Sequence, residues 1–450
     1  MITTSASALP ESSGKNAPGG AVAAHNGALI AATLLFAVAA SAALIVSCRS
    51  CSSCLCYRIA FLCCKMHFAF LDPVNVRRGR LMVQGFFIDV SGSPEARAHA
   101  YGVQAADRIR RGIGHYSEQL SAFNVDSARL DVLVAHYLPI VEAFDEAYVV
   151  EMRAIARGAG VSFSEIMLIN ARTELLKIAA NPEMEKRFKA EAPDGCTAIV
   201  AGPGATRDGK VIHAHNWDWK AECAETSVVL RVRRDDGPDY LTFTEAGALG
   251  RFGLNSAGLA TAGNYLECER DYRDLGVPLS LIRRKILDQT YMAKAVEAVC
   301  TRKSASNNIV LSDRDGMILD FECAPDEMFH VPAANGLMIH ANHWLSLAAQ
   351  VKLRNTGARA FPCSYQRQVR AEGLLVPKLG SITVEDIREV LLDGYGSPWS
   401  ICRPPRPSAF TNLSATVASL IMDPTEGTME IAMLPALAPE FTRYNLHGVR

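Results

Sequence analysis

The dipeptide Gly195–Cys196 is the part of the sequence whose residue types most directly suggest covalent chemistry. Glycine leaves its carbonyl unshielded and conformationally free, so the thiol of the next residue can attack its own preceding peptide bond. Scission through a thioester would leave Cys196 at a new N-terminus. One residue would then carry a thiol nucleophile and an α-amine whose unperturbed pKa, about 7.7 to 8, suits a general base. Taken alone, most such pairs are simply a small buried cysteine that opens a strand.

Several other motifs, in one order along the chain, favour the reactive interpretation. The motifs are DGCT at 194–197, HNWDW at 215–219, TEAGALGRFGLNSAGLA at 244–260, IHANH at 339–343 and SICR at 400–403. With them the sequence resembles, from about Leu81 to Ala432, the peptidase C45 family: the acyl-coenzyme A:6-aminopenicillanic acid acyltransferases and their relatives. The resemblance implies an N-terminal-nucleophile hydrolase with a four-layer αββα fold, made as a precursor that is cut between Gly195 and Cys196.

The same resemblance implies roles for three further residues. Asp218 matches the family aspartate that orients the amine and thiol of the nucleophile, although an aspartate capping a turn is the plainer interpretation. Acyl transfer builds negative charge on the former carbonyl oxygen, and uncharged amides can stabilise it. Asn342 matches the family's Asn-His pair and Asn264 aligns more loosely, so both are candidate oxyanion donors, with turn asparagines as the alternative.

The sequence departs from the family at one catalytic position. Leu413 stands where relatives place a late arginine, and Asn412 replaces the serine before it. Arg403 or Arg406, a few residues upstream, could supply the charge from another backbone position. The loss of the arginine puts penicillin-like transfer in more doubt than amide cleavage.

Other residues allow competing interpretations of the site. His343 could serve Cys196 as the base of an ordinary Cys-His peptidase, but a free α-amine would make an imidazole unnecessary. Trp217 and Trp219 are expected to form pocket wall or core. Gly204, Gly209 and Lys210 match part of a phosphate loop, but a hairpin is preferred because the next segment alternates like a strand.

The elements that must position these residues are readable from periodicity. Pro94 to Lys177 shows helical spacing, with Ser162 and Glu165 as a capping box for a helix through Leu176, so residues 72–195 are predicted as a helical N-terminal (alpha chain) part. Residues 196–450 are predicted as the catalytic (beta chain) part, which gives an α+β fold. It should open with a hairpin turning at Arg207–Lys210. Its other predicted elements are strands around 226–232, 240–247, 307–313, 317–324, 336–342, 415–423 and 428–434, and helices around 279–302 and 384–392, the latter capped by Thr383.

The N-terminal region suggests a membrane anchor. Residues 1–27 are predicted to be a disordered tail, and the uncharged stretch from Ala28 to Val46 has the length of a transmembrane helix, here 28–47. A buried helix and a cleaved signal peptide are the alternatives. Basic residues after the stretch predict a single-pass protein with a cytosolic catalytic part. The cysteine-rich segment 48–71 is expected to be palmitoylated or to hold plain apolar thiols, a metal site being less favoured.

Composition limits the remaining choices. The 450-residue chain has a net charge of −1, which provides no field for nucleic acid, and its thirteen cysteines lack the pattern of a disulfide framework. We expect no cofactor and no metal. The predicted activity is cleavage or transfer of an acyl group from an amide or thioester, acyl-CoA being one candidate donor. The alternatives are an inactive membrane-tethered scaffold of the same fold and the ordinary Cys-His peptidase.

Overall fold

The computed structural model describes residues 85–179, 195–357, 362–407 and 413–448. The chain divides into a unit of Met1–Val74 and a unit of Asn75–Arg450, and all described residues belong to the second. The predicted tail, the membrane segment 28–47 and the cysteine-rich segment 48–71 lie outside them. None of the helices in the described ranges is both long and apolar enough to cross a bilayer. The span at 28–47 stays a prediction.

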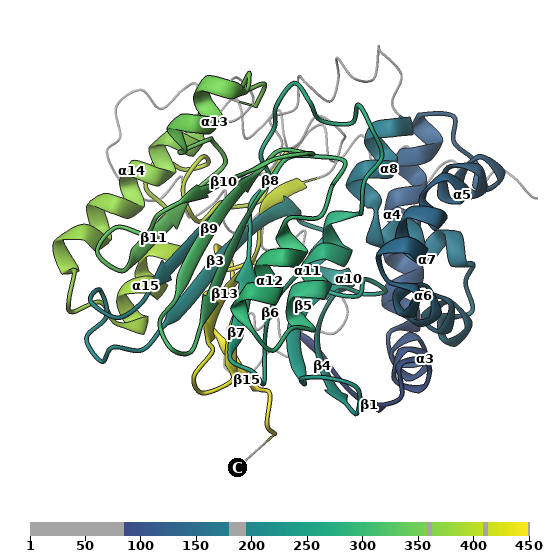
Figure 1. The fold of residues 1–450 in the computed structure, drawn as a ribbon, viewed down its shortest axis with the longest axis horizontal. Coiled ribbons are helices and arrows are strands. Elements are labelled where there is room, and N and C mark those ends of the chain that lie inside the picture. Colours follow the sequence, from purple (N-terminus) through teal and green to yellow (C-terminus); the bar gives the residue numbers. More distant parts are fainter. Residues whose placement is uncertain (1–84, 180–194, 358–361, 408–412, 449–450) are drawn as a thin grey trace, which may run out of the picture. The chain divides into compact units, whose positions relative to one another are not determined.

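Two β-sheets form the centre of the described unit (Figure 1). The first sheet has the order β1-β4-β5-β6-β7-β8-β9-β10, and the second has the order β11-β2-β3-β13-β14-β15, with β12 paired to β13. All neighbours are antiparallel except β1 and β4. The strands of the first sheet are β1 (Phe86–Gly92), β4 (Ser227–Arg234), β5 (Tyr240–Glu245), β6 (Phe252–Asn255), β7 (Leu259–Ala262), β8 (Asn307–Asp313), β9 (Ile318–Cys323) and β10 (Met328–Val331). Those of the second are β2 (Cys196–Ala201), β3 (Ile212–Lys220), β11 (Leu337–His340), β12 (Arg406–Pro407), β13 (Leu413–Asp423), β14 (Thr428–Met433) and β15 (Thr442–Asn445).

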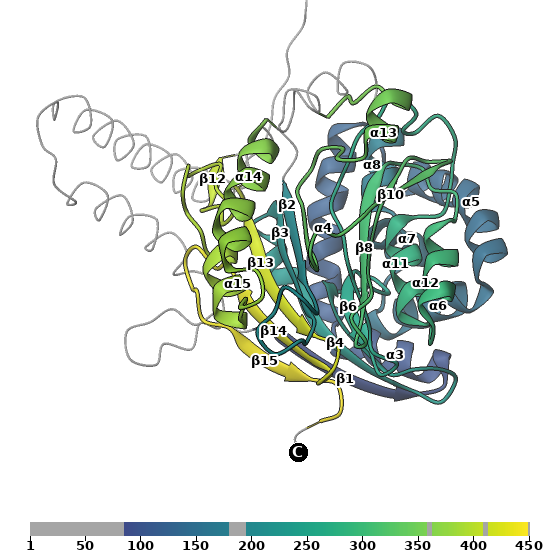
Figure 2. The same ribbon diagram turned by 60° about the vertical axis from the view of Figure 1, so that its left-hand side comes forward.

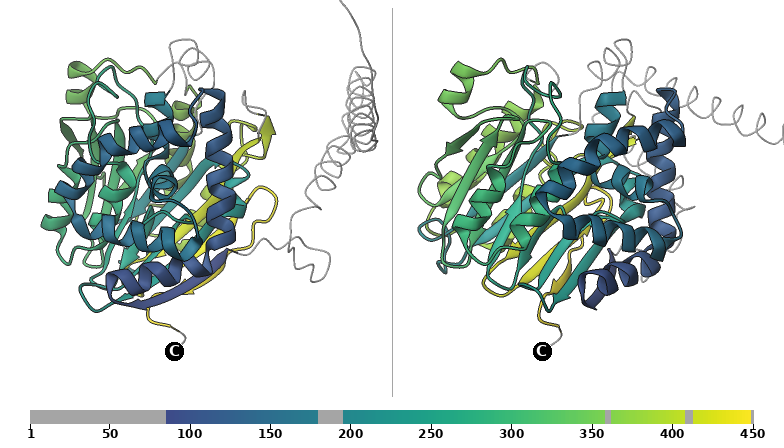
Figure 3. Two further views of the ribbon diagram at one scale, coloured as in Figure 1. Left: turned by 90° about the vertical axis from the view of Figure 1, so that its right-hand side faces the viewer. Right: turned by 45° about the vertical axis from the view of Figure 1, so that its right-hand side comes forward.

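Helices cover the outer faces of both sheets, so the unit has the order helix, sheet, sheet, helix (Figure 2). The helices of the N-terminal part lie outside the first sheet (Figure 3), together with α11 and α12. Helices α14 and α15 pack on the second sheet. The bounds are α3 (Pro94–Gln104), α4 (Ala106–Ala122), α5 (Ser127–Phe144), α6 (Glu146–Ala159), α7 (Phe163–Asn170), α8 (Arg172–Ala179), α10 (Cys223–Thr226), α11 (Leu279–Leu287), α12 (Met292–Val299), α13 (Leu347–Lys352), α14 (Cys363–Leu375), η2 (Val376–Lys378) and α15 (Val384–Leu391).

The layers exist because the strands of both sheets are apolar on two faces. One core fills the space between the first sheet and its helices, and another joins the second sheet to α14 and α15. A third lies between the sheets and contains Cys196, Trp217, Phe243 and Leu420. Burial on both faces removes enough apolar surface from water to hold four layers together. The mixed α+β class and the layer order agree with the sequence prediction.

Local sequence signals are confirmed where short-range bonds decide the structure. Ser162 with Glu165 and Thr383 with Asp386 form reciprocal capping boxes. Strands β2 and β3 pair antiparallel as the predicted hairpin. Lys210 lies in its connecting loop, exposed and paired with Glu426, and a strand rather than a helix follows, so the choice of a hairpin over a phosphate loop is confirmed.

Three predicted helical stretches need correction. The part 72–195 is not wholly helical, because Phe86–Gly92 forms β1, whose pairing partner β4 lies about 140 residues further on in the chain. The helix from Ser162 ends at Asn170, and α8 starts afresh after Ala171. The stretch 279–302 contains two helices, because the Asn255 side-chain amide binds the carbonyls of Leu287 and Gln289 where the first one ends.

Candidate active site

Cys196 is the first residue of β2 and faces the core between the two sheets. Its main-chain N–H donates to Asn342 Oδ1 at 2.8 Å, and the main-chain N–H of Asp218 donates to its sulfur. The side chain is buried, with 7% of its surface exposed. Burial, and then the negative charge of Asp218, raise the thiol pKa to about 11. The thiol is therefore protonated at neutral pH and needs a base before it can act as a nucleophile.

Asp218 is buried near the end of β3, where Thr416 of β13 is its register partner. Thr416 Oγ1 donates to Asp218 Oδ1 at 2.6 Å, and Arg403 Nε lies 3.1 Å from Asp218 Oδ2. The hairpin explains the proximity of Asp218 to the thiol, since Cys196 pairs with Trp217 directly before it. The carboxylate is thus held by two partners, and its negative charge acts on the thiol.

Arg403 carries a buried positive charge next to Asp218. Leu413 begins β13 and is half-buried, whereas the Arg403 side chain is fully buried against Asp218. The main chain of Arg403 is fixed by Thr416, which accepts from its N–H through Oγ1 at 2.8 Å. Arg406, the other residue considered from sequence, stacks on Trp399 with 4.1 Å to the ring centroid.

The two predicted amide donors lie on segments that are bonded to each other. Asn342 Nδ2 donates to Tyr265 O at 2.9 Å, and Asn264 Nδ2 donates to His340 O at 2.7 Å. Asn342 Oδ1 contacts the main-chain nitrogen of Cys196, so this side chain presents its oxygen to the nucleophile residue. Among the described residues Asn264 makes no hydrogen bond with Cys196, and its buried Oδ1 has no hydrogen-bond partner there.

Arg367 of α14 is a site residue that the sequence did not reveal. Its Nη1 donates to Cys196 O and to Thr197 Oγ1, the latter at 2.8 Å, and its Nη2 donates to Asn342 Oδ1 at 2.7 Å. The guanidinium therefore ties the nucleophile strand to Asn342. Within SYQRQVR the residue looks like an ordinary polar position of an amphipathic helix, and no local signal marks it as buried.

Gly195 passes between two guanidinium groups. A Cβ added to it would lie 2.5 Å from Arg367 Nη2 and 2.7 Å from Arg403 Nη2, both far inside normal contact. Only glycine fits this position without moving an arginine. The peptide bond before Cys196 is thus bordered by two cationic hydrogen-bond donors.

The tryptophans beside Asp218 divide between core and partial exposure. Trp217 is buried between the sheets, with its ring at a steep angle to Phe243. Trp219 is half-buried, and its indole N–H donates to Tyr116 of α4 at 3.3 Å. These positions agree with the expectation of pocket wall or core.

His343 is bonded away from the thiol. Its Nδ1 is 2.7 Å from Ser364 Oγ, and its ring stacks on Tyr365 at 4.1 Å between centroids. Burial lowers its pKa to about 4, so the ring is neutral at pH 7. Within the residues described no contact joins it to Cys196, and the structure offers nothing in favour of the Cys-His peptidase.

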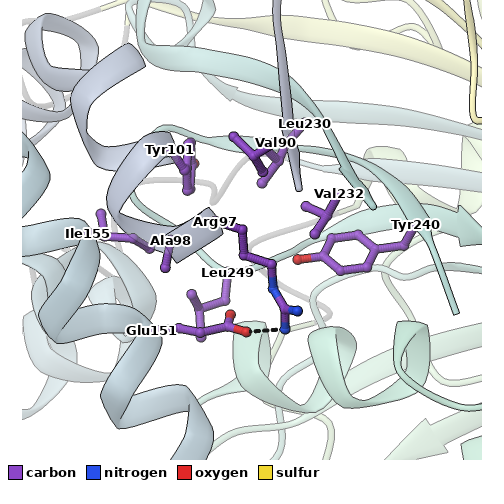
Figure 4. Close-up of a pocket in the computed structure, with 10 residues that line it drawn as sticks. All are labelled: Val90, Arg97, Ala98, Tyr101, Glu151, Ile155, Leu230, Val232, Tyr240 and Leu249. Atoms are coloured by element: carbon purple, nitrogen blue, oxygen red, sulfur yellow. Dashed lines mark hydrogen bonds and ion pairs between the residues drawn. The ribbon is translucent and has the colours of Figure 1, made fainter. Parts of the chain in front are cut away.

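Two further features bear on binding. In the described ranges no three His, Cys, Asp or Glu side chains converge as a metal site. A small cavity between α3, α6 and the first sheet is lined by Arg97, Glu151 and Tyr240 among others (Figure 4). Its Arg97 and Glu151 side chains pair at 2.7 Å, and none of the predicted site residues lines it.

The fold and site describe a layered α+β protein with a buried cysteine at the head of a central strand. Residues 205–434 match the model of the acyl-coenzyme A:6-aminopenicillanic acid acyl-transferase family, and the chain belongs to that family. The matched range holds Asp218, Asn264 and Asn342 and begins after Cys196. The general chemistry of the family is acyl transfer or amide hydrolysis.

The individual relatives have low sequence identity to this chain. The chain is 27% identical over 324 residues to the 40 kDa form of acyl-coenzyme A:6-aminopenicillanic-acid-acyltransferase from Emericella nidulans, covering 70% of this chain and 84% of the relative. Among solved structures it is similar to a mutant of conjugated bile acid hydrolase from Clostridium perfringens, with 12% identity, a TM-score of 0.42 and coverage of 57% and 93%. It is also similar to penicillin V acylase from Agrobacterium tumefaciens, with 15% identity, a TM-score of 0.36 and coverage of 56% and 87%.

Proposed function

We propose that this protein is an autoprocessed N-terminal cysteine amidohydrolase or acyltransferase that forms an acyl-enzyme on Cys196. The observation that carries the proposal is the convergence of Asn342 on the nitrogen and Asp218 on the sulfur of one cysteine. A nucleophile that brings its own base needs partners at both of these atoms. Membership of an acyl-transferring family supports the same chemistry.

The first step of the proposal is cleavage of the precursor. The Cys196 sulfur attacks the Gly195 carbonyl carbon, the C–N bond breaks, and the nitrogen takes the thiol proton to become an amine. Water then hydrolyses the thioester, leaving a carboxylate on Gly195 and a thiol on Cys196. In this proposal Arg367 and Arg403, whose guanidinium groups lie beside Gly195, stabilise negative charge on its carbonyl oxygen.

The second step is turnover by the new N-terminus. The free amine takes the thiol proton, and the sulfur attacks the carbonyl of an amide or thioester to form an acyl-enzyme. The leaving amine or thiol carries that proton away. Water or another nucleophile then releases the acyl group. Asn342 Oδ1 can accept from the amine, which directs its lone pair toward the thiol.

Arg403 favours an active enzyme over an inactive scaffold. A buried carboxylate such as Asp218 is costly without a cationic partner, and Arg403 supplies one. Asp218 therefore has a cationic partner in spite of the leucine at position 413.

Mass spectrometry of the purified full-length protein tests the proposal. A fragment beginning at Cys196 is expected from the wild type and not from Cys196→Ala. The wild-type fragment should gain an acyl group on Cys196 when treated with a reactive S-phenyl thioester. An intact wild-type chain whose Cys196 is never acylated would overturn both steps.

A substitution at the cleavage site gives a sharper test. Gly195→Ala puts a methyl group against both arginines and should slow appearance of the Cys196 fragment by at least about 10-fold, roughly the cost of overpacking. Gly373→Ala in α14 meets no atom within 4 Å and should be processed like the wild type. Equal cleavage rates of the two variants would mean that Arg367 and Arg403 do not act in the cleavage step.

A further inference from the structure

Three arginines border the core between the sheets that contains Cys196: Arg172 and Arg283 are buried, and Arg251 is half-buried. Arg172 of α8 and Arg251 before β6 both contact the same carboxylate, Glu245, with Arg172 Nε at 2.7 Å from Glu245 Oε2. Arg283 of α11 is the third. Its guanidinium and that of Arg251 both lie over the Phe252 ring, 5.2 Å and 5.8 Å from the centroid, and Phe252 packs in the same core as Cys196.

Arg283 differs from its neighbours because no carboxylate contacts it within the part of the chain that the structure describes. Its side chain donates to Gly263 O at 3.2 Å, and its buried Nε has no hydrogen-bond partner. Only 6% of the residue is exposed. Its guanidinium lies over the Phe252 ring, 5.2 Å from the centroid. The Arg283 guanidinium is thus a fixed cation against the face of the Phe252 ring, and it still has an N–H that can donate a hydrogen bond.

In the described part of the chain neither Glu245 nor Glu174 forms an ion pair with Arg283. Glu245 serves two other arginines, and Glu174 Oε1 accepts from the Leu279 N–H at 3.0 Å. The Cys196 thiol is protonated at neutral pH, since its pKa is raised to about 11. Burial, and then Arg251, lower the Arg283 pKa to about 9, which leaves it charged at pH 7.

A buried cation without a partner is costly, and an arriving anion removes that cost. Arginine's planar fork suits a carboxylate, which accepts two parallel bonds. We propose that Arg283, with Arg251 beside it, binds a carboxylate of the substrate while Cys196 attacks a nearby carbonyl. The inference rests on the proposed function, because it assigns the substrate class of the same site. The carboxylate belongs to the acyl group or to the leaving group.

Four thioesters separate these two sources. The S-phenyl thioesters of glutaric acid and pentanoic acid differ only in a carboxylate on the acyl side. Pentanoyl thioesters of 3-mercaptopropionate and of 3-mercaptopropionamide differ only in a carboxylate on the leaving side. The rate of acylation of Cys196 is measured by peptide mass spectrometry in the full-length wild type, in Arg283→Gln, and in Arg302→Gln, whose exposed ion pair with Asp274 is the matched control.

In one of the two pairs, Arg283→Gln should slow acylation by the carboxylate thioester about 100-fold and change its neutral partner less than about threefold. The pair that responds identifies the side that carries the carboxylate. Arg302→Gln should change no rate, and circular dichroism together with the amount of Cys196 fragment shows that each variant is folded. If wild-type Cys196 is acylated but Arg283→Gln slows charged and neutral partners alike, or slows neither, this inference is wrong. If no thioester acylates wild-type Cys196, the proposed function itself fails and the inference with it.

Discussion

At the scale of residues, the candidate site is defined by which atoms of Cys196 are contacted. The Asn342 side chain accepts from its main-chain nitrogen, and the Arg367 side chain donates to its carbonyl oxygen. The main-chain N–H of Asp218 donates to its sulfur. Each partner comes from a different element, so the cysteine is fixed in orientation before any substrate arrives. This preorganisation is what a thiol needs when its conjugate base must be generated on demand.

The buried ion pair of Arg403 with Asp218 leads to a prediction at the same scale. Arg403→Gln leaves the buried Asp218 carboxylate without its cation and should lower the free energy of unfolding by about 3 kcal/mol or more. Arg406→Gln removes a contact with Trp399 and should cost about 1 kcal/mol or less. Urea denaturation of both variants in the uncleavable Cys196→Ala background measures the difference. Equal losses would mean that Arg403 does not neutralise Asp218.

At the scale of elements, the site depends on how strands and helices are brought into register. The β2–β3 hairpin places Asp218 one residue beyond the partner of Cys196, and β13 brings Thr416 to the Asp218 carboxylate. Helix α14 packs on the same sheet and delivers Arg367. Helices α3 and α6, outside the first sheet, cross closely. Gly102 of α3 lies against the main chain of α6, and Gly158 of α6 lies against the main chain of α3.

This close crossing can be tested with two glycines of the N-terminal helices. A Cβ at Gly102 would collide with the Ile155 carbonyl oxygen of α6, whereas a Cβ at Gly114 of α4 meets nothing within 4 Å. Gly102→Ala should therefore destabilise the protein by about 1–3 kcal/mol. Gly114→Ala should be neutral or stabilise by up to about 1 kcal/mol through helix propensity. Denaturation curves that rank the two variants in the opposite order would exclude the crossing seen here.

At the scale of the whole unit, polar side chains join the two sheets through their shared core. His213 of β3 lies 2.8 Å from Ser312 of β8, and His340 of β11 lies 2.9 Å from Glu322 of β9. Burial lowers the pKa of both histidines, but their net pKa shifts are opposite. The pKa of His213 falls to about 3 because burial disfavours its charged form, while that of His340 rises to about 9, because the neighbouring carboxylates Asp320 and Glu322 outweigh burial.

His213 gives the unit a predicted sensitivity to acid. Because its folded pKa is depressed, its contribution to stability is present above the unfolded pKa of about 6.5 and is lost as pH falls toward 3. The loss should be about 1.4 kcal/mol per pH unit below pH 6. His213→Gln removes this titration, so its stability should fall less steeply than that of the wild type between about pH 6 and 4.5. Above about pH 7.5 the gap between the two proteins should stay constant, and parallel curves below pH 6 would contradict the assignment.

Sequence alone determined the features that short-range chemistry decides. The capping boxes at Ser162 and Thr383 and the hairpin after Cys196 follow from neighbours a few residues apart, and the structure has them. The choice of Cys196, Asp218 and Asn342 as candidates came from motif resemblance, and the fold brings these three together.

Only the tertiary structure decided which distant side chains reach that cysteine. It set Arg403 against Asp218, added Arg367 from an ordinary-looking helix, and left Arg283 buried without a carboxylate among the described residues. It also formed β1, whose partner β4 lies far along the chain. The physical reason is the same for the three arginines and for β1. Strand pairing and charge compensation depend on how the two sheets and their covering helices pack, and the spacing of residues along the chain does not determine that packing.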